Sequence, residues 1–278
     1  FEYLNIPYAG CDVCASAVGM DKWAMKSLFK SAGLPVVEGI LTHKKKWFHD
    51  TEAEVQRVEA VCGGYPVVVK PVNLGSSIGI SKARDRQQLE EAVETAMEYA
   101  DRVIVETCVA NLREINCSVL GDLDECQSSV CEEPLNATDI LTFGDKYESG
   151  SKGSSKGMES LSRKIPADLP EDVTEKIQHL AAEAFRAING NGVARIDFMM
   201  NNETGEVFIN EINTIPGSLA FYLWQESGIA FDELLDKMIW LAIKRKREKD
   251  ALTVTFDTNI LSNNALGGSK GGKMGSKR

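Results

Sequence analysis

The chain lacks several features that mark specialised classes of protein. It has 278 residues but only three histidines, and no apolar run approaches the length that spans a membrane. Its 31 lysines and arginines are outnumbered by 41 aspartates and glutamates, which gives a net charge of -10. General nucleic-acid and anionic-membrane binders select clustered basic residues, so neither partner is expected. Because no signal peptide opens the chain either, the sequence predicts a soluble, cytoplasmic protein.

Cysteine is present, but not in a pattern that forms a known site. The seven cysteines are odd in number and scattered, which is typical of reduced thiols. Cys11 and Cys14 form a lone C-x-x-C, and His43, His49 and His179 are not spaced to complete a zinc site with them. A zinc site is therefore not expected, and a redox role has little support. The rest of the composition, 43% hydrophobic and 26% charged, is that of an ordinary globular protein of one large or two ordinary domains.

Two apolar stretches near the C-terminal end carry polar residues at strand spacing. Arg195 and Asp197 lie two apart in the first, and Glu211 and Asn213 lie two apart in the second. Strand geometry puts such pairs on one face, and the turn-forming residues 201–205 predict an antiparallel hairpin that brings the four together. Carboxylate and amide oxygens suit Mg²⁺, which takes further ligands from nucleotide phosphates, so ATP is the expected partner. A structural ion-pair network is the alternative; it explains any one of these residues better than all four.

The first half of the chain predicts a small α+β unit. Glycine and proline at positions 33 and 35 end a first predicted helix. The predicted elements are a helix over 20–30, a solvated loop at 44–46, a strand over 65–71, a helix over 86–100 and a strand over 102–106.

A loop of small residues follows the predicted strand that carries Lys70. Its sequence, Gly75-Ser76-Ser77-Ile78-Gly79, could hold a phosphate, since glycines admit backbone N–H groups close to an anion and hydroxyls donate as well. It is not a P-loop, because the G-x-x-x-x-G-K-[ST] spacing is absent. Taken alone, such a loop is more often a plain turn.

The second half predicts a further α+β unit with a lid. The segment 142–158, with Lys146 among repeated glycines and serines, is too glycine-rich for a regular element and too long for a plain connection. The other predicted elements are a strand over 115–120, amphipathic helices over 171–188 and 231–246, and a disordered tail over 262–278.

Six short motifs occur in the order and approximate spacing of one known family. They are Met20-Asp21-Lys22, Val69-Lys70-Pro71, Gly75-Ser76-Ser77-Ile78-Gly79, Lys146-Tyr147, Ala194-Arg195-Ile196-Asp197 and the run from Asn210 to Gly217. Over residues 1–245 the chain resembles D-alanine:D-alanine ligases of the ATP-grasp superfamily. The resemblance implies an α+β ATP-grasp fold, with two α+β subdomains that hold ATP between them. The corresponding boundaries are 1–19 for the remnant of an N-terminal substrate domain, 20–108 for the central subdomain, 109–261 for the C-terminal subdomain with lid and metal site, and 262–278 for the tail.

The resemblance also implies a role for each matching nucleotide-site residue. The matches to phosphate-binding groups are Lys22, Lys70, Ser76 and Ser77. The matches to the segment that reads adenine are Glu106, Cys108 and Val109, and Glu114 matches the carboxylate that holds the ribose. Lys146 and Tyr147 match the lid pair that closes over the γ-phosphate and the substrates.

The implied chemistry joins two D-alanine molecules for peptidoglycan synthesis. Asp197, Glu211 and Asn213 match ligands of two Mg²⁺ ions, for which Mn²⁺ is an alternative. A D-alanine carboxylate attacks the γ-phosphate to give an acyl phosphate, and the amine of a second D-alanine then attacks that carbonyl. Arg195 and the Gly217 backbone N–H match the pair that stabilises the resulting oxyanion, and the matched catalytic set also includes Ser76, Lys146 and Tyr147.

The chain departs from the family pattern in two places. Relatives carry an additional N-terminal domain that grips the first substrate, and residues 1–19 resemble only its last segment, so we expect a fragment. A homodimer is implied where that domain is present. After Gly217, relatives have a hydroxyl-rich stretch that binds the second substrate, and here Ser218 and Tyr222 are the candidates. The second substrate could thus be D-alanine, D-serine or D-lactate, and a nucleotide-binding module without turnover is the remaining alternative.

Overall fold

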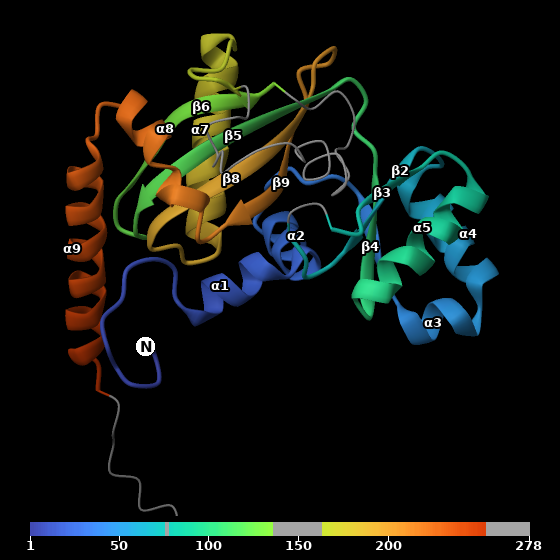
Figure 1. The fold of residues 1–278 in the computed structure, drawn as a ribbon, viewed down its shortest axis with the longest axis horizontal. Helices are drawn as coiled ribbons and strands as arrows, with labels where there is room; N and C mark the ends of the chain where they lie inside the picture. Colours follow the sequence, from blue (N-terminus) through green and yellow to red (C-terminus); the bar gives the residue numbers. More distant parts are fainter. Residues whose placement is uncertain (76–77, 136–162, 254–278) are drawn as a thin grey trace, which may run out of the picture.

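The structure, a computed structural model, describes residues 1–75, 78–135 and 163–253. These residues form two antiparallel sheets with flanking helices, and the connection 108–111 leads from one sheet to the other (Figure 1). Both halves are α+β, as predicted from the sequence.

The first sheet has four strands and separates an apolar face from a polar one. Its order is β1 (Gly39–His43), β4 (Arg102–Thr107), β2 (Val67–Pro71) and β3 (Ser81–Ala83). Helices α3 (Lys44–His49), α4 (Thr51–Cys62) and α5 (Arg86–Tyr99) bury one face in a core that includes Val67, Val69, Val103 and Val105. Because side chains alternate along a strand, Lys70 and Glu106 lie on the opposite face. This polar face carries part of the candidate site.

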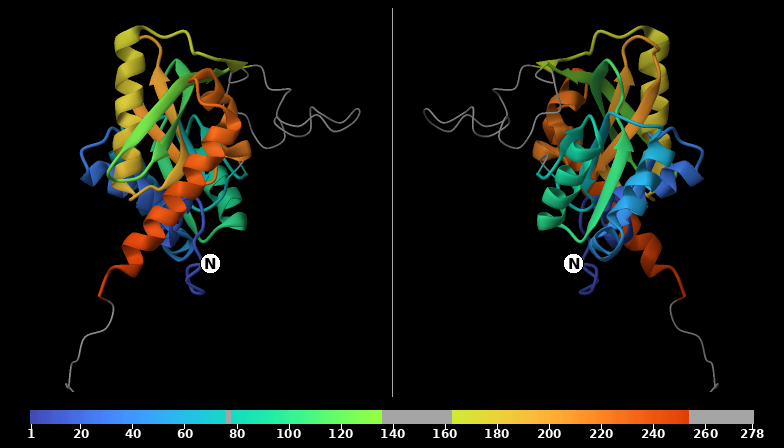
Figure 2. Two further views of the ribbon diagram at one scale, coloured as in Figure 1. Left: turned by 90° about the vertical axis from the view of Figure 1, so that its left-hand side faces the viewer. Right: turned by 90° about the vertical axis from the view of Figure 1, so that its right-hand side faces the viewer.

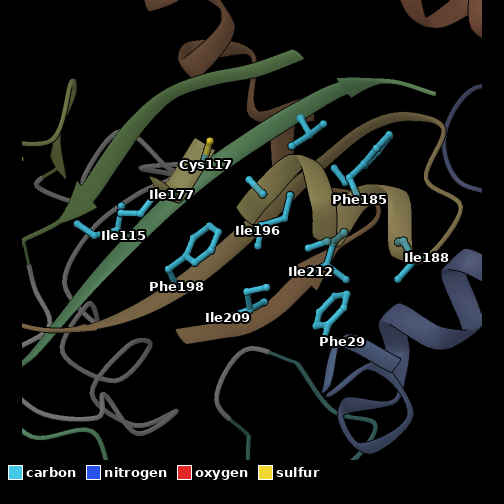
Figure 3. Packing of buried hydrophobic residues seen from close by; sticks show 14 of the residues in the cluster. Phe29, Ile115, Cys117, Ile177, Phe185, Ile188, Ile196, Phe198, Ile209 and Ile212 are labelled. Carbon is cyan, nitrogen blue, oxygen red and sulfur yellow. The ribbon is translucent and has the colours of Figure 1, made fainter. Parts of the chain in front are cut away.

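The second sheet has five strands between two helical layers. Its order is β7 (Arg163–Lys164), β6 (Cys126–Pro134), β5 (Leu112–Gly121), β8 (Gly192–Asn201) and β9 (Val207–Asn213). Helix α7 (Glu171–Ala187) covers one face, and α8 (Phe221–Glu226) and α9 (Phe231–Asp250) lie on the other side (Figure 2). The core under α7 includes Ile115, Ile177, Phe185 and Ile196 (Figure 3).

Two short helices connect the two halves. Helix α1 (Val13–Met20) precedes α2 (Lys22–Ser31), and α2 buries Met25 and Phe29 in the core of the five-stranded sheet. The sequence predicted a single helix over 20–30 and missed α1, because its small residues give no apolar stripe. Asp21 separates the two helices in an extended conformation, and its carboxylate accepts hydrogen bonds from the N–H groups of Trp23 and Ala24.

Other predictions are confirmed or corrected at the level of single elements. Residues 44–46 were predicted as a loop but form the start of α3, whose Trp47 is fully buried. The predicted strand 115–120 is part of the longer β5, and the last predicted helix extends to Asp250 as α9. All seven cysteines are free thiols, as expected.

Some predictions cannot be followed in the structure. The lid over 142–158, the loop serines Ser76 and Ser77, and the tail over 262–278 lie outside the described residues. Within the described ranges, no helix is both long and apolar enough to cross a bilayer.

Candidate active site

The predicted hairpin is formed by β8 and β9, and its register brings the four polar residues together. Arg195 lies opposite Asn213, and Asp197 lies opposite Glu211. Arg195 holds Asp197 through two bonds, Nε to Oδ1 at 2.6 Å and an NH2 nitrogen to Oδ2 at 2.8 Å. Asn213 Nδ2 also donates to Asp197 Oδ2, at 2.9 Å. The convergence predicted from residue spacing is therefore confirmed.

The hairpin contains a β-bulge in β9, and the residue at this bulge contacts a lysine of the four-stranded sheet. The register passes from Asp197 opposite Glu211 directly to Phe198 opposite Ile209, so Asn210 is the extra residue. Lys70 Nζ donates to Asn210 Oδ1 at 3.1 Å, and Lys22 Nζ contacts Glu211 Oε2 at 2.9 Å. Two lysines thus reach across to neighbouring residues of one strand, and β9 is joined to the rest of the site at the bulge.

The two hairpin carboxylates differ in electrostatic environment. Burial raises the pKa of Asp197, although Arg195 acts in the opposite direction. Burial would also raise the pKa of Glu211, but Lys22, Lys70 and Arg195 together hold that pKa below its usual value. Like charges directly opposite on neighbouring strands repel, so this pair requires compensating cations, which Arg195 and Lys22 provide.

The sequence analysis missed a buried ion triad. It consists of Glu106, Lys26 and Lys70, and Lys70 is also one of the two lysines that contact β9. Glu106, 1% exposed, pairs with Lys26 and with Lys70, whose Nζ is 2.7 Å from Glu106 Oε2. Burial would raise the pKa of Glu106, yet the two lysines lower it to about 2. Burial lowers the pKa of Lys26 to about 8 despite its partner. One signal could have revealed Lys26: it follows Lys22 by four residues, which places both on one face of α2.

Polar residues continue across the sheet in one row. Glu132 on β6 lies opposite Asn116 on β5, which lies opposite Asp197, which in turn lies opposite Glu211. Asn116 Nδ2 donates to Glu132 Oε1 at 2.9 Å, and the Tyr222 hydroxyl donates to the same oxygen at 2.9 Å. Burial, followed by Glu132, raises the pKa of Tyr222 to about 12. Neither Glu132 nor Asn116 was predicted, because nothing in the local sequence sets them apart from ordinary strand residues.

The remaining predicted residues occupy defined places around this row. Glu114 lies half-buried on β5, and Cys108 and Val109 lie in the connection between the sheets. Gly217 begins the short 3-10 helix η2 (Gly217–Ala220), which packs against β8. Ser218 is exposed and has a left-handed backbone, with φ of 51°. Lys146 and Tyr147, like Ser76 and Ser77, lie outside the described residues.

The donor set fits Mg²⁺ better than a transition metal. In the described part of the chain, no three His, Cys, Asp or Glu side chains cluster closely enough to hold a metal ion. The site instead offers two carboxylates and an amide, which are hard oxygen ligands in small number. Mg²⁺ keeps several waters and completes its shell with phosphates, so it needs few ligands from the protein.

The chain is similar to known proteins over most of its length. The family described as "D-ala D-ala ligase C-terminus" matches residues 28–240. A D-alanine--D-alanine ligase of Acetivibrio thermocellus is 44% identical, over 88% of this chain and 63% of the relative. A second, of Bacillus licheniformis, is 43% identical, over 92% of this chain and 68% of the relative. The chain thus spans less than two thirds of the length of the first relative.

Two solved structures are similar in fold. The D-alanine-D-alanine ligase from Coxiella burnetii has a TM-score of 0.73 and 31% identity, over 90% of this chain and 64% of that one. VanG D-Ala:D-Ser ligase from Enterococcus faecalis has a TM-score of 0.72 and 31% identity, over 87% of this chain and 67% of that one.

Proposed function

The chain belongs to the D-alanine:D-alanine ligase family, and from this premise we propose that it forms the ATP-binding and catalytic portion of an ATP-dependent ligase that joins two D-alanine molecules. One observation carries the proposal. Lys22 of α2 contacts Glu211 of β9, and Lys70 of β2 contacts Asn210 of the same strand. Cationic groups thus face metal-type ligands across a junction between two subdomains, which is the arrangement that a nucleotide with bound Mg²⁺ requires.

In the proposed site, each side chain acts on a different part of the reactants. Lys22 and Lys70 bind ATP phosphates, the segment from Glu106 to Val109 lines the adenine, and Glu114 binds the ribose. Asp197, Glu211 and Asn213 hold Mg²⁺, which when bound supplies neutralisation of phosphate charge. The contacts of Lys22 with Glu211 and of Arg195 with Asp197 support the proposal, because they balance the charge of the same carboxylates.

The proposed reaction uses the protein for positioning and charge stabilisation. A D-alanine carboxylate oxygen attacks the γ-phosphorus and ADP leaves, which gives an acyl phosphate. The amine of the second D-alanine attacks the acyl carbon, loses a proton, and phosphate departs. Arg195 and the Gly217 N–H stabilise negative charge on the carbonyl oxygen between these steps. No protein nucleophile takes part.

The experiment that tests the proposal is mass spectrometry of products. The chain is incubated with MgATP and D-alanine, alone and with D-serine or D-lactate. D-alanyl-D-alanine is the expected product. ADP release without D-alanine would instead indicate an incomplete site, and MgATP binding without any release would indicate a binding module, so either result contradicts the proposed ligase activity for this chain.

A related second substrate is the one alternative that an observation favours. The D-Ala:D-Ser ligase matches the fold with a TM-score of 0.72, against 0.73 for the D-alanine-D-alanine ligase, so the fold does not separate the two substrates. The same experiment separates them, because D-alanyl-D-serine differs in mass from D-alanyl-D-alanine.

A further inference from the structure

Lys26 is a buried charged residue beside the candidate site that no motif singled out. It lies on α2 and is 4% exposed. Met25 and Phe29 of the same helix are fully buried in the core of the five-stranded sheet, and they fix this part of α2 in place. The Lys26 ammonium pairs with Oε1 of Glu106 on β4. Burying a charge is costly unless it has a partner, so Lys26 depends on this carboxylate.

Lys70 pairs with the other oxygen of the same carboxylate. Its Nζ is 2.7 Å from Glu106 Oε2, and it also donates to Asn210 Oδ1 at 3.1 Å. In the register of β2 and β4, Glu106 lies opposite Val68, which is two residues from Lys70 and on the same face of the sheet. Among the described residues, no further group donates a hydrogen bond to either Glu106 oxygen. The two ammonium groups therefore compensate this carboxylate between them.

The triad of Lys26, Lys70 and Glu106 holds two positive charges and one negative charge. Burial lowers the pKa of Lys26 to about 8, and the like charge of Lys70 acts in the same direction. Because this value lies above 7, Lys26 keeps its charge at neutral pH. One net positive charge therefore remains in the triad. Lys70, which reaches Asn210 of β9, is the member that can present this charge to a ligand at the junction of the two subdomains.

Without Lys26, the carboxylate of Glu106 would neutralise Lys70. A pair of one lysine and one carboxylate has no net charge and attracts a phosphate only weakly. The effect is large in a buried site, because charges there are screened less than in water. With Lys26 in place, Glu106 still orients Lys70 but does not cancel its charge.

We propose that Lys26 is a positioning residue of the nucleotide site: by pairing with Glu106, it leaves the charge of Lys70 available to bind a phosphate of ATP. The inference rests on the proposed function, in which Lys70 binds ATP. It adds a residue that acts on the nucleotide through Glu106 and Lys70 and does not contact it.

The first test is calorimetric titration of the full chain at pH 7 with the Mg²⁺ complex of a non-hydrolysable ATP analogue. In Lys26→Met, the Kd should rise at least about tenfold, the size expected when a nucleotide loses one charged partner. Lys26→Gln should give the same rise and serves if Lys26→Met does not fold. Lys30→Met, one turn further along α2 and paired with exposed Glu38, should keep the Kd within about twofold. A wild-type Kd in Lys26→Met would overturn the proposal.

A double variant separates this role from a purely structural one. Lys26→Met combined with Glu106→Gln removes one positive and one negative charge, so the triad again has one net positive charge, on Lys70. The Kd of the double variant should return to within about threefold of the wild-type value, although both substitutions lie in the core. A structural role predicts losses that add. A double variant that binds no better than Lys26→Met would therefore contradict the proposal.

Kinetics and product analysis keep the positioning role and the ligase activity apart. In Lys26→Met, the KM for ATP should rise with the Kd while kcat stays within about threefold, because Lys26 contacts none of the reacting atoms. If the wild type makes the dipeptide but Lys26→Met keeps the wild-type Kd, the positioning role is wrong and the ligase stands. If nucleotide binding depends on Lys26 but no dipeptide forms, the ligase activity fails and the positioning role stands. A wild-type chain that binds no nucleotide would overturn both.

Discussion

At the scale of single residues, Glu211 is repelled by one neighbouring charge and attracted by another. It lies directly opposite Asp197, and it is held by Lys22. A carboxylate in this position requires a cation beside it, and in the proposed function Mg²⁺ would supply that positive charge in place of Lys22.

Glu211→Gln should therefore lower turnover by at least about 100-fold, since it removes one of the two carboxylate charges that would hold Mg²⁺. The measurement is the initial rate of ADP formation with D-alanine and MgATP. Glu203→Gln, an exposed change in the turn of the same hairpin, is the control and should keep the wild-type rate. Near-normal turnover in Glu211→Gln would exclude its role as a metal ligand.

Glu106 is a residue whose loss should act mainly on stability. It is buried between Lys26 and Lys70, so Glu106→Gln leaves two buried ammonium groups without their counter-charge. We expect a loss of about 3–5 kcal/mol in the free energy of unfolding, measured by urea denaturation at pH 7. Glu38→Gln breaks the exposed Lys30 pair and should change the same free energy by less than about 1 kcal/mol. Equal losses in the two variants would contradict the buried triad.

The same triad predicts a pH dependence. The pKa of Glu106 is about 2 in the folded protein, below its usual value of 4.5, so the folded state binds fewer protons than the unfolded state between these values. The contribution of Glu106 is therefore fully present above pH 4.5 and is lost as the pH falls toward 2. The difference in unfolding free energy between wild type and Glu106→Gln should shrink over this range. A difference that stays constant with pH would show that the carboxylate is not held ionised.

At the scale of elements, Asp21 combines a helix cap with an ion pair. Its Oδ1 accepts the N–H groups that begin α2, and its Oδ2 contacts Arg102 at 2.7 Å. The residue that starts the helix therefore also fixes it to β4, and Lys22 follows directly.

Replacing Asp21 in two ways should separate these effects. Asp21→Asn keeps a capping oxygen and weakens only the half-exposed ion pair, so it should cost less than about 1 kcal/mol. Asp21→Ala removes both and should cost about 1–2 kcal/mol. Thermal or urea unfolding of the two variants measures the difference. If both cost the same, the cap contributes nothing to α2.

Local sequence patterns predicted the hairpin but not its contacts with distant parts of the chain. Strand alternation around Arg195 and Asp197 was sufficient to predict a shared face, because that rule acts over a few residues. The bulge at Asn210 depends on pairing with β8, and the contact of Lys22 with Glu211 spans 189 positions in the sequence. Strand β6 was missed because its serines, glutamine and cysteines give no β-branched signal, and Glu132 was missed with it.

At the scale of the whole molecule, α2 and β2 link the two sheets through lysine contacts with β9. Lys22 also donates to the Leu74 carbonyl at 3.0 Å, beside the loop that resembles a phosphate cradle. The proposed nucleotide would take over these contacts, binding the lysines with its phosphates while Mg²⁺ takes Glu211. Ligand binding and the junction between the subdomains should therefore be thermodynamically linked.

This linkage can be measured as a shift in melting temperature. A ligand at 100 times its Kd stabilises the folded state by about 2.7 kcal/mol, which corresponds to about 5–10 °C for a protein of this size. MgATP should give such a shift in wild type. Lys22→Met should lose about half of it, because a tenfold weaker Kd removes about 1.4 kcal/mol at the same concentration. Lys30→Met, on the same helix and paired with exposed Glu38, should keep the full shift. A full shift in Lys22→Met would mean that the nucleotide binds without this lysine, and that the contact between α2 and β9 is structural alone.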